Sequence, residues 1–204
     1  MNVRVAVLVS GTGTNLQALL DDPHVGPAIV LVVSSRADAP ALERAHARGV
    51  GTAVLEPRLF QSREAHDQAL LDLFLREGIE FVLNAGYMRI LTPVVVGPFA
   101  ERWLNIHPSL LPAFPGAHPV RDVLEWGGRV TGVTIHFVDE EADHGPIVLQ
   151  ETVPVFPDDD EDTLHARIQD VEHRLYPRTA RLLIEGKLKV QGRRVHILDE
   201  EGEP

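Results

Sequence analysis

The chain of 204 residues carries 30 Asp and Glu against 19 Lys and Arg, which gives a formal net charge of −11 at pH 7, and it has no cysteine. The acidic balance argues against sequence-independent binding to nucleic acid or to an anionic membrane, and the lack of cysteine excludes a disulfide framework and a thiolate nucleophile, so we expect small-molecule partners. No apolar run reaches the length of a membrane span and the N-terminus lacks the zones of a signal peptide, so we expect a cytoplasmic location.

Short apolar runs alternate with helical patterns along the first half of the chain. Strands are predicted, in chain order, over residues 3–9, 28–33, 52–55, 81–85 and 103–106. Helices are predicted between them, after the turn at 10–15 and over 39–48, 63–77 and 93–99. Ser62 is the expected N-cap of the helix over 63–77, and the apolar stripe of this helix is expected to consist of Leu70, Leu71, Phe74 and Leu75.

The second half of the chain has a different pattern. A Pro-rich segment over 107–119 precedes a short helix over 121–126 and two longer strands over 130–138 and 147–155, which are predicted to form a hairpin. The last long helix carries an apolar stripe of Leu164, Ile168, Val171 and Leu175. Pro177 is expected to kink this helix and Gly186 to end it, before a terminal hairpin that turns at Gln191-Gly192.

Apolar strands that alternate with helices are typical of a mostly parallel sheet covered on both faces. We therefore expect a Rossmann-like α/β fold with an antiparallel edge formed by the C-terminal strands. No internal repeat or low-complexity linker is present, so a single domain over residues 1–204 is predicted, with a short acidic tail from about residue 199.

The glycine-rich turn Ser10-Gly11-Thr12-Gly13-Thr14-Asn15 runs from the first strand into a helix. Such a turn presents unpaired backbone N–H groups and the positive end of a helix dipole, which favours phosphate. The third glycine of a dinucleotide fingerprint is missing, so a tight turn without a ligand is the alternative, and Asn15 could cap the helix in either case. Ser34-Ser35-Arg36 lies where a dinucleotide-binding protein reads the ribose, which keeps an NADP-linked reductase as a second function class.

Asn105 and His107 follow the apolar strand over 103–106 and belong to the segment that ends at Pro112. Their side chains are expected to emerge together at the carboxyl edge of the sheet, where open α/β folds bind ligands. The amide can donate to a developing oxyanion, and the imidazole can donate or accept a proton near neutral pH. In the alternative, His107 only satisfies a buried backbone group beside a proline turn.

An acidic loop with Asp139, Glu140, Glu141 and Asp143 connects the two strands of the predicted hairpin. A charge run is usually a solvated surface loop, and we expect that for the first three residues. Asp143 lies between Ala142 and a turn that starts the next apolar strand, so it is expected to approach the sheet. A carboxylate beside His107 would favour the protonated imidazole.

Taken together, these motifs resemble the glycinamide ribonucleotide formyltransferase family. The resemblance rests on the Ser-Gly-x-Gly-x-Asn turn, on Met88-Arg89-Ile90-Leu91, on the segment from Asn105 to Pro112 with Pro115-Gly116, and on the stretch from Gly132 through Asp143 to Gly145, and it spans nearly the whole chain. It implies the formyltransferase fold and formyl transfer from the co-substrate 10-formyltetrahydrofolate to the amine of N1-(5-phosphoribosyl)glycinamide in de novo purine (IMP) biosynthesis, without a metal. It leaves both a monomer and a homodimer open.

The resemblance also implies roles for individual residues. The ribonucleotide phosphate would be held by the turn of Gly11, Thr12, Gly13, Thr14 and Asn15. Its glycinamide part would contact Glu172, with Gln169 as a second candidate one helical turn earlier. The folate would be bound by Arg63, Met88, Arg89, Ile90, Leu91 and Asn105 and by the backbone of Glu140, Glu141, Ala142 and Asp143.

The implied mechanism is attack of the glycinamide amine on the formyl carbon. Asn105 and His107 would stabilise the oxyanion, and Asp143 would keep His107 protonated and help to relay a proton through water. His136 could lie near this centre or only pack within its strand. The loop after Gly116 reads Ala117-His118-Pro119-Val120, whereas relatives often have a second histidine near Val120. His144 stands where many relatives have glycine. His118 is therefore a further possible site residue.

Three alternatives remain open from the sequence. The Asn, His and Asp signature is shared by the wider folate-dependent group, so another folate-dependent formyltransferase or a formyltetrahydrofolate hydrolase is possible, although those carry extra domains for which this chain has no room. An NADP-linked reductase is more remote. A metal centre of His107, His118, His136 and His144 is disfavoured, because no metal-ligand spacing supports it.

Overall fold

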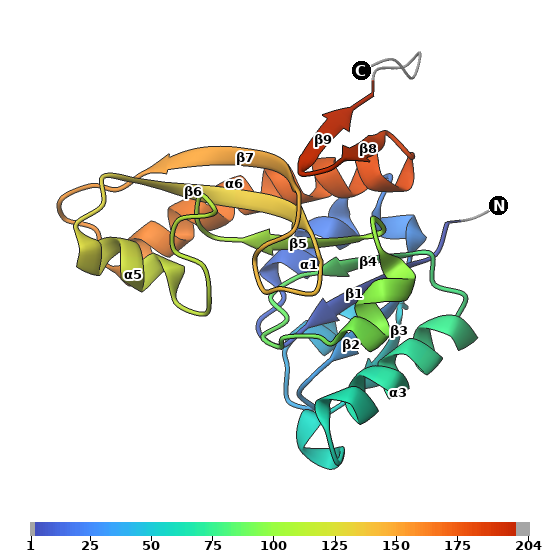
Figure 1. Cartoon of the computed structure of the whole chain (residues 1–204). Helices are drawn as coiled ribbons and strands as arrows, with labels where there is room; N and C mark the ends of the chain where they lie inside the picture. The colour runs from blue at the N-terminus through green and yellow to red at the C-terminus, as the bar shows by residue number, and fades with distance from the viewer. Residues whose placement is uncertain (1–2, 199–204) are drawn as a thin grey trace.

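The computed structural model describes residues 3–198, so the acidic tail predicted from about residue 199 lies outside the described residues. One twisted sheet runs through the described chain and carries helices on both faces (Figure 1). Its strands are β1 (Val5–Val9), β2 (Ile29–Ser34), β3 (Gly51–Val54), β4 (Phe81–Asn84), β5 (Trp103–His107), β6 (Val130–Phe137), β7 (Ile147–Pro154), β8 (Leu188–Gln191) and β9 (Arg194–Ile197). Its α-helices are α1 (Thr14–Asp21), α2 (Ala41–Ala47), α3 (Arg63–Arg76), α4 (Pro93–Val96), α5 (Pro119–Trp126) and α6 (Glu161–Ile184).

The sheet changes character in its middle. Across residues 3–198 the strand order is β3-β2-β1-β4-β5-β6-β7-β9-β8, and the first five strands of this order are parallel. From β5 onward, β6 and β7 pair antiparallel, and the β8–β9 hairpin joins the edge of β7. This arrangement confirms the expected Rossmann-like, mostly parallel fold with an antiparallel C-terminal part.

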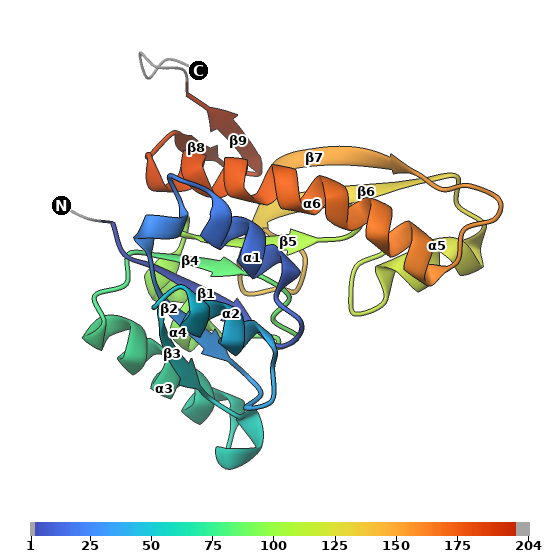
Figure 2. The same ribbon diagram turned by 180° about the vertical axis from the view of Figure 1, so that it is seen from behind.

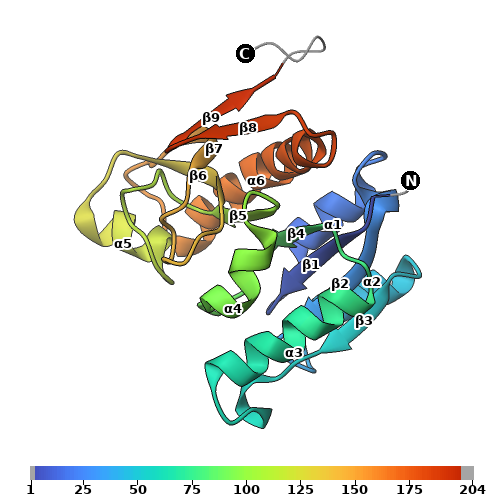
Figure 3. The same ribbon diagram turned by 45° about the vertical axis from the view of Figure 1, so that its right-hand side comes forward.

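Two apolar cores cover the two faces of the sheet. Leu16 and Leu19 of α1, together with Leu164 and Ile168 of α6, belong to the core on one face, and Figure 2 shows α1, α2 and α6 in front of the sheet on this side. The other core contains Phe74 of α3, and Figure 3 shows α3 and α4 on that side. None of the described helices combines the length and apolarity needed to cross a bilayer.

The structure corrects two details of the sequence prediction. Asn15 does not cap α1, because the helix begins at Thr14 with Gly13 at its N-cap. Pro177 lies inside α6, which continues as one helix of 24 residues and ends at Ile184, just before Gly186 as predicted. On α3, Ser62 caps the helix as predicted, but Leu75 is 64% exposed, and the buried face consists of His66, Asp67, Leu70, Leu73 and Phe74. The predicted spacing of three to four residues between buried positions is present in α3. The predicted stripe nevertheless included the exposed Leu75 and missed His66, Asp67 and Leu73.

Candidate active site

A cavity of about 680 Å³ opens at the carboxyl edge of the central strands. It lies at the edge where β1, β4 and β5 end, as expected for ligand sites in open α/β folds. It brings together most of the residues selected from the sequence: Gly11, Thr12, Gly13, Thr14, Asn15, Met88, Arg89, Ile90, Leu91, Asn105, His107, His118, His136, Glu140, Glu141, Ala142, Asp143, Gln169 and Glu172. Arg63 is not among its lining residues.

The glycine turn forms one end of this cavity. Gly13 adopts φ +76°, and a Cβ on it would lie 2.6 Å from the Cβ of Ala41, so the turn requires glycine here. A Cβ on Gly11 would meet nothing within 4 Å, so that backbone borders open space. The side chain of Arg44 braces the turn from behind, because its Nε donates to the carbonyl oxygen of Thr12 at 2.8 Å. The first N–H groups of α1 have no partner within the helix, which suits an anion at this end of the cavity.

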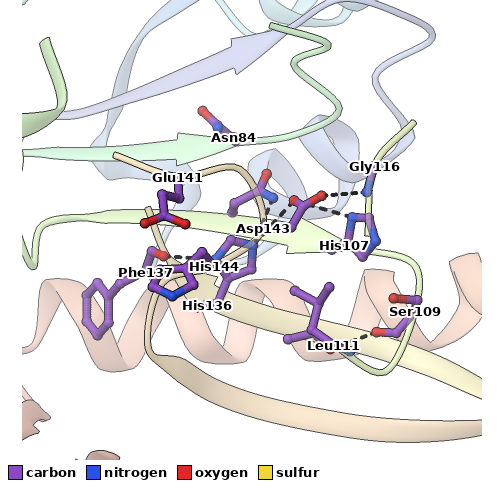
Figure 4. A network of polar contacts seen from close by, with 12 residues as sticks. Asn84, His107, Ser109, Leu111, Gly116, His136, Phe137, Glu141, Asp143 and His144 are labelled. Carbon is purple, nitrogen blue, oxygen red and sulfur yellow. Dashed lines mark hydrogen bonds and ion pairs between the residues drawn. The ribbon is translucent and has the colours of Figure 1, made fainter. Parts of the chain in front are cut away.

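His107 lies at the end of β5 and is almost completely buried. Its Nε2 is 2.9 Å from the carbonyl oxygen of Phe114, and since a carbonyl only accepts, Nε2 carries a proton and donates. Its Nδ1 lies 3.6 Å from Oδ1 of Asp143 (Figure 4). The ring is therefore fixed on one side by a backbone carbonyl and faces a carboxylate on the other.

Asp143 approaches the sheet from the loop between β6 and β7. Its Oδ2 accepts a hydrogen bond of 2.8 Å from the backbone N–H of Gly116, and its side chain is 14% exposed (Figure 4). The residue adopts φ +54°, a region that Asp and Asn enter more readily than other non-glycine residues. The expected approach of Asp143 to His107 is thus present, and the backbone of Gly116 holds the carboxylate. Gly116 was noted from the sequence only as part of a Pro-Gly motif.

Asn105 and His136 face each other across the β5–β6 pair. They are register partners, and Nδ2 of Asn105 lies 3.1 Å from Nε2 of His136. Nδ1 of His136 lies 2.8 Å from the carbonyl oxygen of Phe137, so this nitrogen donates and Nε2 accepts from the amide. Burial lowers the pKa of His136, which agrees with a neutral ring. His136 therefore orients the Asn105 amide and leaves its second N–H for another acceptor.

A buried hydrogen-bond network supports the segment that follows β5. The hydroxyl of Thr134 donates to the carbonyl oxygen of Ser109 at 2.7 Å and accepts from the backbone N–H of Leu111 at 3.0 Å (Figure 4). Gln150 donates to the carbonyl oxygen of Leu111 at 2.9 Å. Sequence reasoning did not select Thr134 or Gln150, because alternating polar residues on a strand carry no specific signal of a supporting role. The network fixes the turn beside His107.

Glu172 connects the last helix to the glycine turn. It is 4% exposed, and its Oε2 accepts from Nδ2 of Asn15 at 2.9 Å. Burial raises the pKa of the Glu172 carboxyl, although the bond from Asn15 opposes this effect. Oδ1 of Asn15 is buried without a hydrogen-bond partner in the described structure. Asn15 is therefore a link between α1 and α6 rather than a cap, and this end of the cavity holds a buried carboxyl group.

The segment Met88–Leu91 forms another wall of the cavity, next to the glycine turn, because the backbone N–H of Met88 donates to Oγ of Ser10 at 3.0 Å. Met88 and Ile90 are 62% and 61% exposed, whereas Leu91 is buried. Arg63, which the resemblance placed in the folate site, donates from Nη2 to the carbonyl oxygen of Ile90 at 2.9 Å and so holds the backbone of this wall. The two exposed apolar side chains on a cavity wall provide a surface on which a flat ring can pack.

The acidic loop closes the cavity near Asp143. Asp139 accepts from the backbone N–H of Glu141 at 3.0 Å and from Nδ1 of His144 at 2.7 Å. His144 is bound in turn by Arg193 in the β8–β9 turn, whose Nη2 donates to the His144 carbonyl at 2.7 Å. The loop is therefore held by its own side chains and by the C-terminal hairpin.

The feature that kept an NADP-linked reductase open lies apart from these side chains. Arg36 donates twice to Asp38, at 3.0 and 2.8 Å, and borders a separate cleft with Ser35. The guanidinium that could have read a nucleotide phosphate is thus engaged by a carboxylate. Across residues 3–198, no three His, Asp or Glu side chains are grouped as metal ligands.

Comparison with known proteins identifies the family of this chain. The formyl transferase family model matches residues 3–180. The phosphoribosylglycinamide formyltransferase of Escherichia coli (strain K12) is 44% identical over 191 residues, which cover 92% of this chain and 90% of that protein. The trifunctional purine biosynthetic protein adenosine-3 of Gallus gallus is 45% identical over 195 residues, which cover 92% of this chain but 19% of that longer protein.

Solved structures show the same similarity. The crystal structure of glycinamide ribonucleotide transformylase 1 from Symbiobacterium toebii superposes with a TM-score of 0.93 at 48% identity, covering 97% of this chain and 94% of that one. That of phosphoribosylglycinamide formyltransferase from Bacillus halodurans gives a TM-score of 0.85 at 41% identity, covering 89% and 95%. The chain therefore belongs to the formyl transferase family and, within it, to the phosphoribosylglycinamide formyltransferases.

Proposed function

We propose that this protein transfers the formyl group of 10-formyltetrahydrofolate to the amine of N1-(5-phosphoribosyl)glycinamide, a step of purine biosynthesis. The observation that carries the proposal is the meeting of Asn105, His107 and Asp143 in one cavity, whose lining also includes the glycine turn and the segment Met88–Leu91. This cavity offers an anion site, an apolar wall, and hydrogen-bond donors beside a carboxylate. Family membership supports the same reaction.

Asn105 and His107 would act on the formyl oxygen as it gains negative charge. The Asn105 amide is oriented by neutral His136, so it can donate its second N–H without reorganisation. His107 donates from Nε2 to Phe114, so the nitrogen that faces the reaction is Nδ1. Asp143 lies on the same side, so its carboxylate can exchange a proton with this nitrogen while the oxyanion forms.

Asp143 would also move the proton that the attacking amine must lose. One of its oxygens is occupied by Gly116, and the other lies 3.6 Å from His107 and 3.9 Å from Nε2 of His136. Such spacings are longer than direct hydrogen bonds, and a water molecule or a substrate atom beside both groups can bridge them. Proton transfer to the departing folate nitrogen through this position needs no covalent enzyme intermediate.

The two substrates would bind different parts of the cavity lining. The ribonucleotide phosphate would bind the turn Gly11–Asn15, which places its glycinamide within reach of Glu172 and Gln169. The folate would pack against Met88 and Ile90, with backbone groups of Glu140–Asp143 at the pterin edge. His118 also lines the cavity and would border the entrance on the side of α5.

The test is absorbance-monitored turnover of a 10-formyl folate by the purified protein, with and without glycinamide ribonucleotide. Turnover that depends on the ribonucleotide is the expected result and identifies the acceptor and the reaction together. Turnover without it would identify a formyl folate hydrolase. No turnover of formyl folate under either condition would overturn the proposal.

A further inference from the structure

The segment Met88–Leu91, at which the folate is proposed to bind, is called the folate wall below. A buried polar pair lies behind this wall and outside the cavity. His66 and Asp67, in the second turn of α3, are 4% and 2% exposed. Nδ1 of His66 lies 2.8 Å from Oδ1 of Asp67, and the ring packs edge-on against Phe60 at 5.1 Å between centroids. A charged pair on the buried face of a helix is costly unless it is fully paired, so its presence calls for a structural reason.

Asp67 reaches from α3 to the end of the folate wall. Its Oδ2 accepts a short hydrogen bond of 2.5 Å from the backbone N–H of Thr92, the residue that follows Leu91. Burial opposes ionisation of this carboxyl, but hydrogen bonds from His66 and Thr92 outweigh it and lower the pKa of Asp67. Asp67 is therefore an ionised acceptor at neutral pH.

His66 holds the Asp67 side chain in this orientation. Its Nε2 lies 3.3 Å from the carbonyl oxygen of Leu55, so the ring is bonded on both sides. Tyr87, at the other end of the folate wall, has its hydroxyl buried without a hydrogen-bond partner in the described structure, and the negative charge of Asp67 adds to the burial that raises its pKa. The pair thus sits directly beneath the wall.

The folate wall has no regular secondary structure of its own. Residues 87–92 lie between β4 and α4 and belong to neither. Besides the bonds that the Thr92 carbonyl accepts from Val95 and Val96 of α4, three hydrogen bonds to other elements fix the backbone: Met88 N–H to Ser10 Oγ at 3.0 Å, Arg63 Nη2 to the Ile90 carbonyl at 2.9 Å, and Thr92 N–H to Asp67. Two of these three ties come from α3. The exposed side chains of Met88 and Ile90 therefore take their positions from bonds that α3 supplies.

We infer that Asp67, held by His66, is a positioning residue that sets the conformation of Met88–Leu91 and thereby the affinity for the formyl folate. This inference rests on the proposed function for the identity of the ligand, but the conformational part stands on the contacts alone. Loss of the hydrogen bond from Thr92 to Asp67 should displace the folate wall only. The glycine turn and the group of Asn105, His107 and Asp143 are held by other hydrogen bonds, which this loss leaves in place.

The chain offers a specific probe of this wall. It contains two methionines, Met1 and Met88, so a protein labelled with [methyl-¹³C]methionine reports on Met88 through one of at most two methyl signals. The test variant is Asp67→Ala. Asp67→Asn is the conservative rescue, because its amide oxygen can accept from Thr92 and its NH₂ can donate to a neutral His66. Asp72→Ala is the matched control on the same helix, since Asp72 is exposed and accepts only from Gln68.

In Asp67→Ala we expect the Met88 signal to shift and the KM for the formyl folate to rise about tenfold, the change that corresponds to about 1.4 kcal/mol of binding. The KM for the ribonucleotide should change less than twofold, and the effect on kcat should be smaller than that on the folate KM. Asp67→Asn should restore the Met88 signal and most of the affinity. Asp72→Ala should match the wild type in both measurements.

Several outcomes would overturn the inference. A folded Asp67→Ala protein with an unchanged Met88 signal would do so, as would equal increases in both KM values, which would assign Asp67 to general stability. If Asp67→Ala does not fold, His66→Phe replaces it, because it removes the bond to Asp67 but retains a ring beside Phe60. An unchanged Met88 signal in His66→Phe would also contradict the inference. If neither variant folds, His66 and Asp67 serve the stability of the core alone, and the inference fails. If the wild type turns over no formyl folate, the proposed function fails, and the Met88 signal still decides the conformational part.

Discussion

The two ends of the cavity are built from different parts of the polypeptide. At the glycine turn, between parallel β1 and α1, the groups that face the cavity are mainly backbone, and the conformation depends on Gly13 at φ +76°. At the β5–β6 junction, the groups that face the cavity are the side chains of Asn105, His107 and His136, and the antiparallel register aligns Asn105 with His136. A backbone site is sensitive to added atoms, whereas a side-chain site is sensitive to changed charge and donors.

The groups proposed to bind the phosphate and the groups proposed to take part in the reaction therefore come from different parts of the same sheet. The parallel strands end in turns whose N–H groups can hold an anion of any shape that reaches them. The antiparallel pair places polar side chains at neighbouring register positions, which gives the fixed distances that proton transfer requires. Substitutions at the two ends should therefore have separable kinetic effects.

The largest effect is expected for Asp143→Asn. The substitution removes the charge that faces His107 but keeps an oxygen for the Gly116 N–H, and Asn tolerates the positive φ of this position. We expect kcat to fall about 10²–10⁴-fold, the usual range for loss of general acid–base catalysis, with little change in the melting temperature. Steady-state kinetics and a thermal melt on the same sample check this. Activity within tenfold of the wild type would remove Asp143 from the mechanism.

At the backbone end, Gly11→Val tests binding without chemistry. A Cβ on Gly11 meets nothing within 4 Å, so the fold should tolerate the side chain, which would instead occupy the space that the phosphate needs. We expect the KM for the ribonucleotide to rise about tenfold or more, equivalent to about 1.4 kcal/mol, with the KM for formyl folate unchanged.

Gly13→Val is the informative contrast to that variant. Its Cβ would clash with Ala41 and its φ is positive, so it should lower the melting temperature as well as the affinity. If Gly11→Val raised only the folate KM, the phosphate would have to be placed elsewhere.

The last prediction concerns the stability of the fold at Glu172, where stability and binding oppose each other. The folded-state pKa of this carboxyl is raised above its unfolded value, so its contribution to stability is complete below about pH 4.5 and is lost as the pH rises through the folded-state pKa. Glu172→Gln removes this loss and can still accept from Asn15. At pH 7 we expect a gain on the order of 1–3 kcal/mol and a rise in Tm of at least about 2 °C.

Two comparisons check the Glu172 prediction. The stability difference between Glu172→Gln and the wild type should shrink as the pH is lowered toward 4.5, which thermal melts across this range will show. The variant should also bind the ribonucleotide more weakly. A variant that is less stable than the wild type at pH 7 would contradict the stated cost of burying this carboxylate.

Much of this molecule was predictable from its sequence, for identifiable reasons. Continuous apolar runs such as Val5–Val9 can only be strands buried on both faces, so the alternation of strands and helices followed directly. The approach of Asp143 to the sheet was predictable from its place just before the turn that starts β7. Its meeting with His107 depends on tertiary structure, because β5 and β6 are antiparallel and the loop after β6 has to fold back along β5 to reach the end of that strand. The roles of these residues in catalysis, and the single-domain organisation of the whole chain, stay predictions.

Other features depend on tertiary contacts that local patterns do not contain. The expected stripe on α3 counted apolar residues, whereas the buried face includes His66 and Asp67, which are tolerated there because Thr92, Leu55 and each other pair with them. Asn15 was read as a cap because its partner, Glu172, lies 157 positions away in sequence. Pro177 interrupts neither the length nor the packing of α6, since neighbours such as Tyr176 are anchored in the core.

The left-handed backbone at Asp143 restricts how this position can evolve. Only a few residue types adopt φ +54° without strain, among them Asn, Asp and Gly. A longer carboxylate such as Glu would have to satisfy both the backbone and the distance to His107, and single substitutions that keep an acid here are limited to the residue already present. The backbone conformation at Asp143 therefore restricts the residues that this position accepts, in addition to the requirement for a carboxylate. Sequence changes in this loop are expected at the flanking residues before they occur at Asp143.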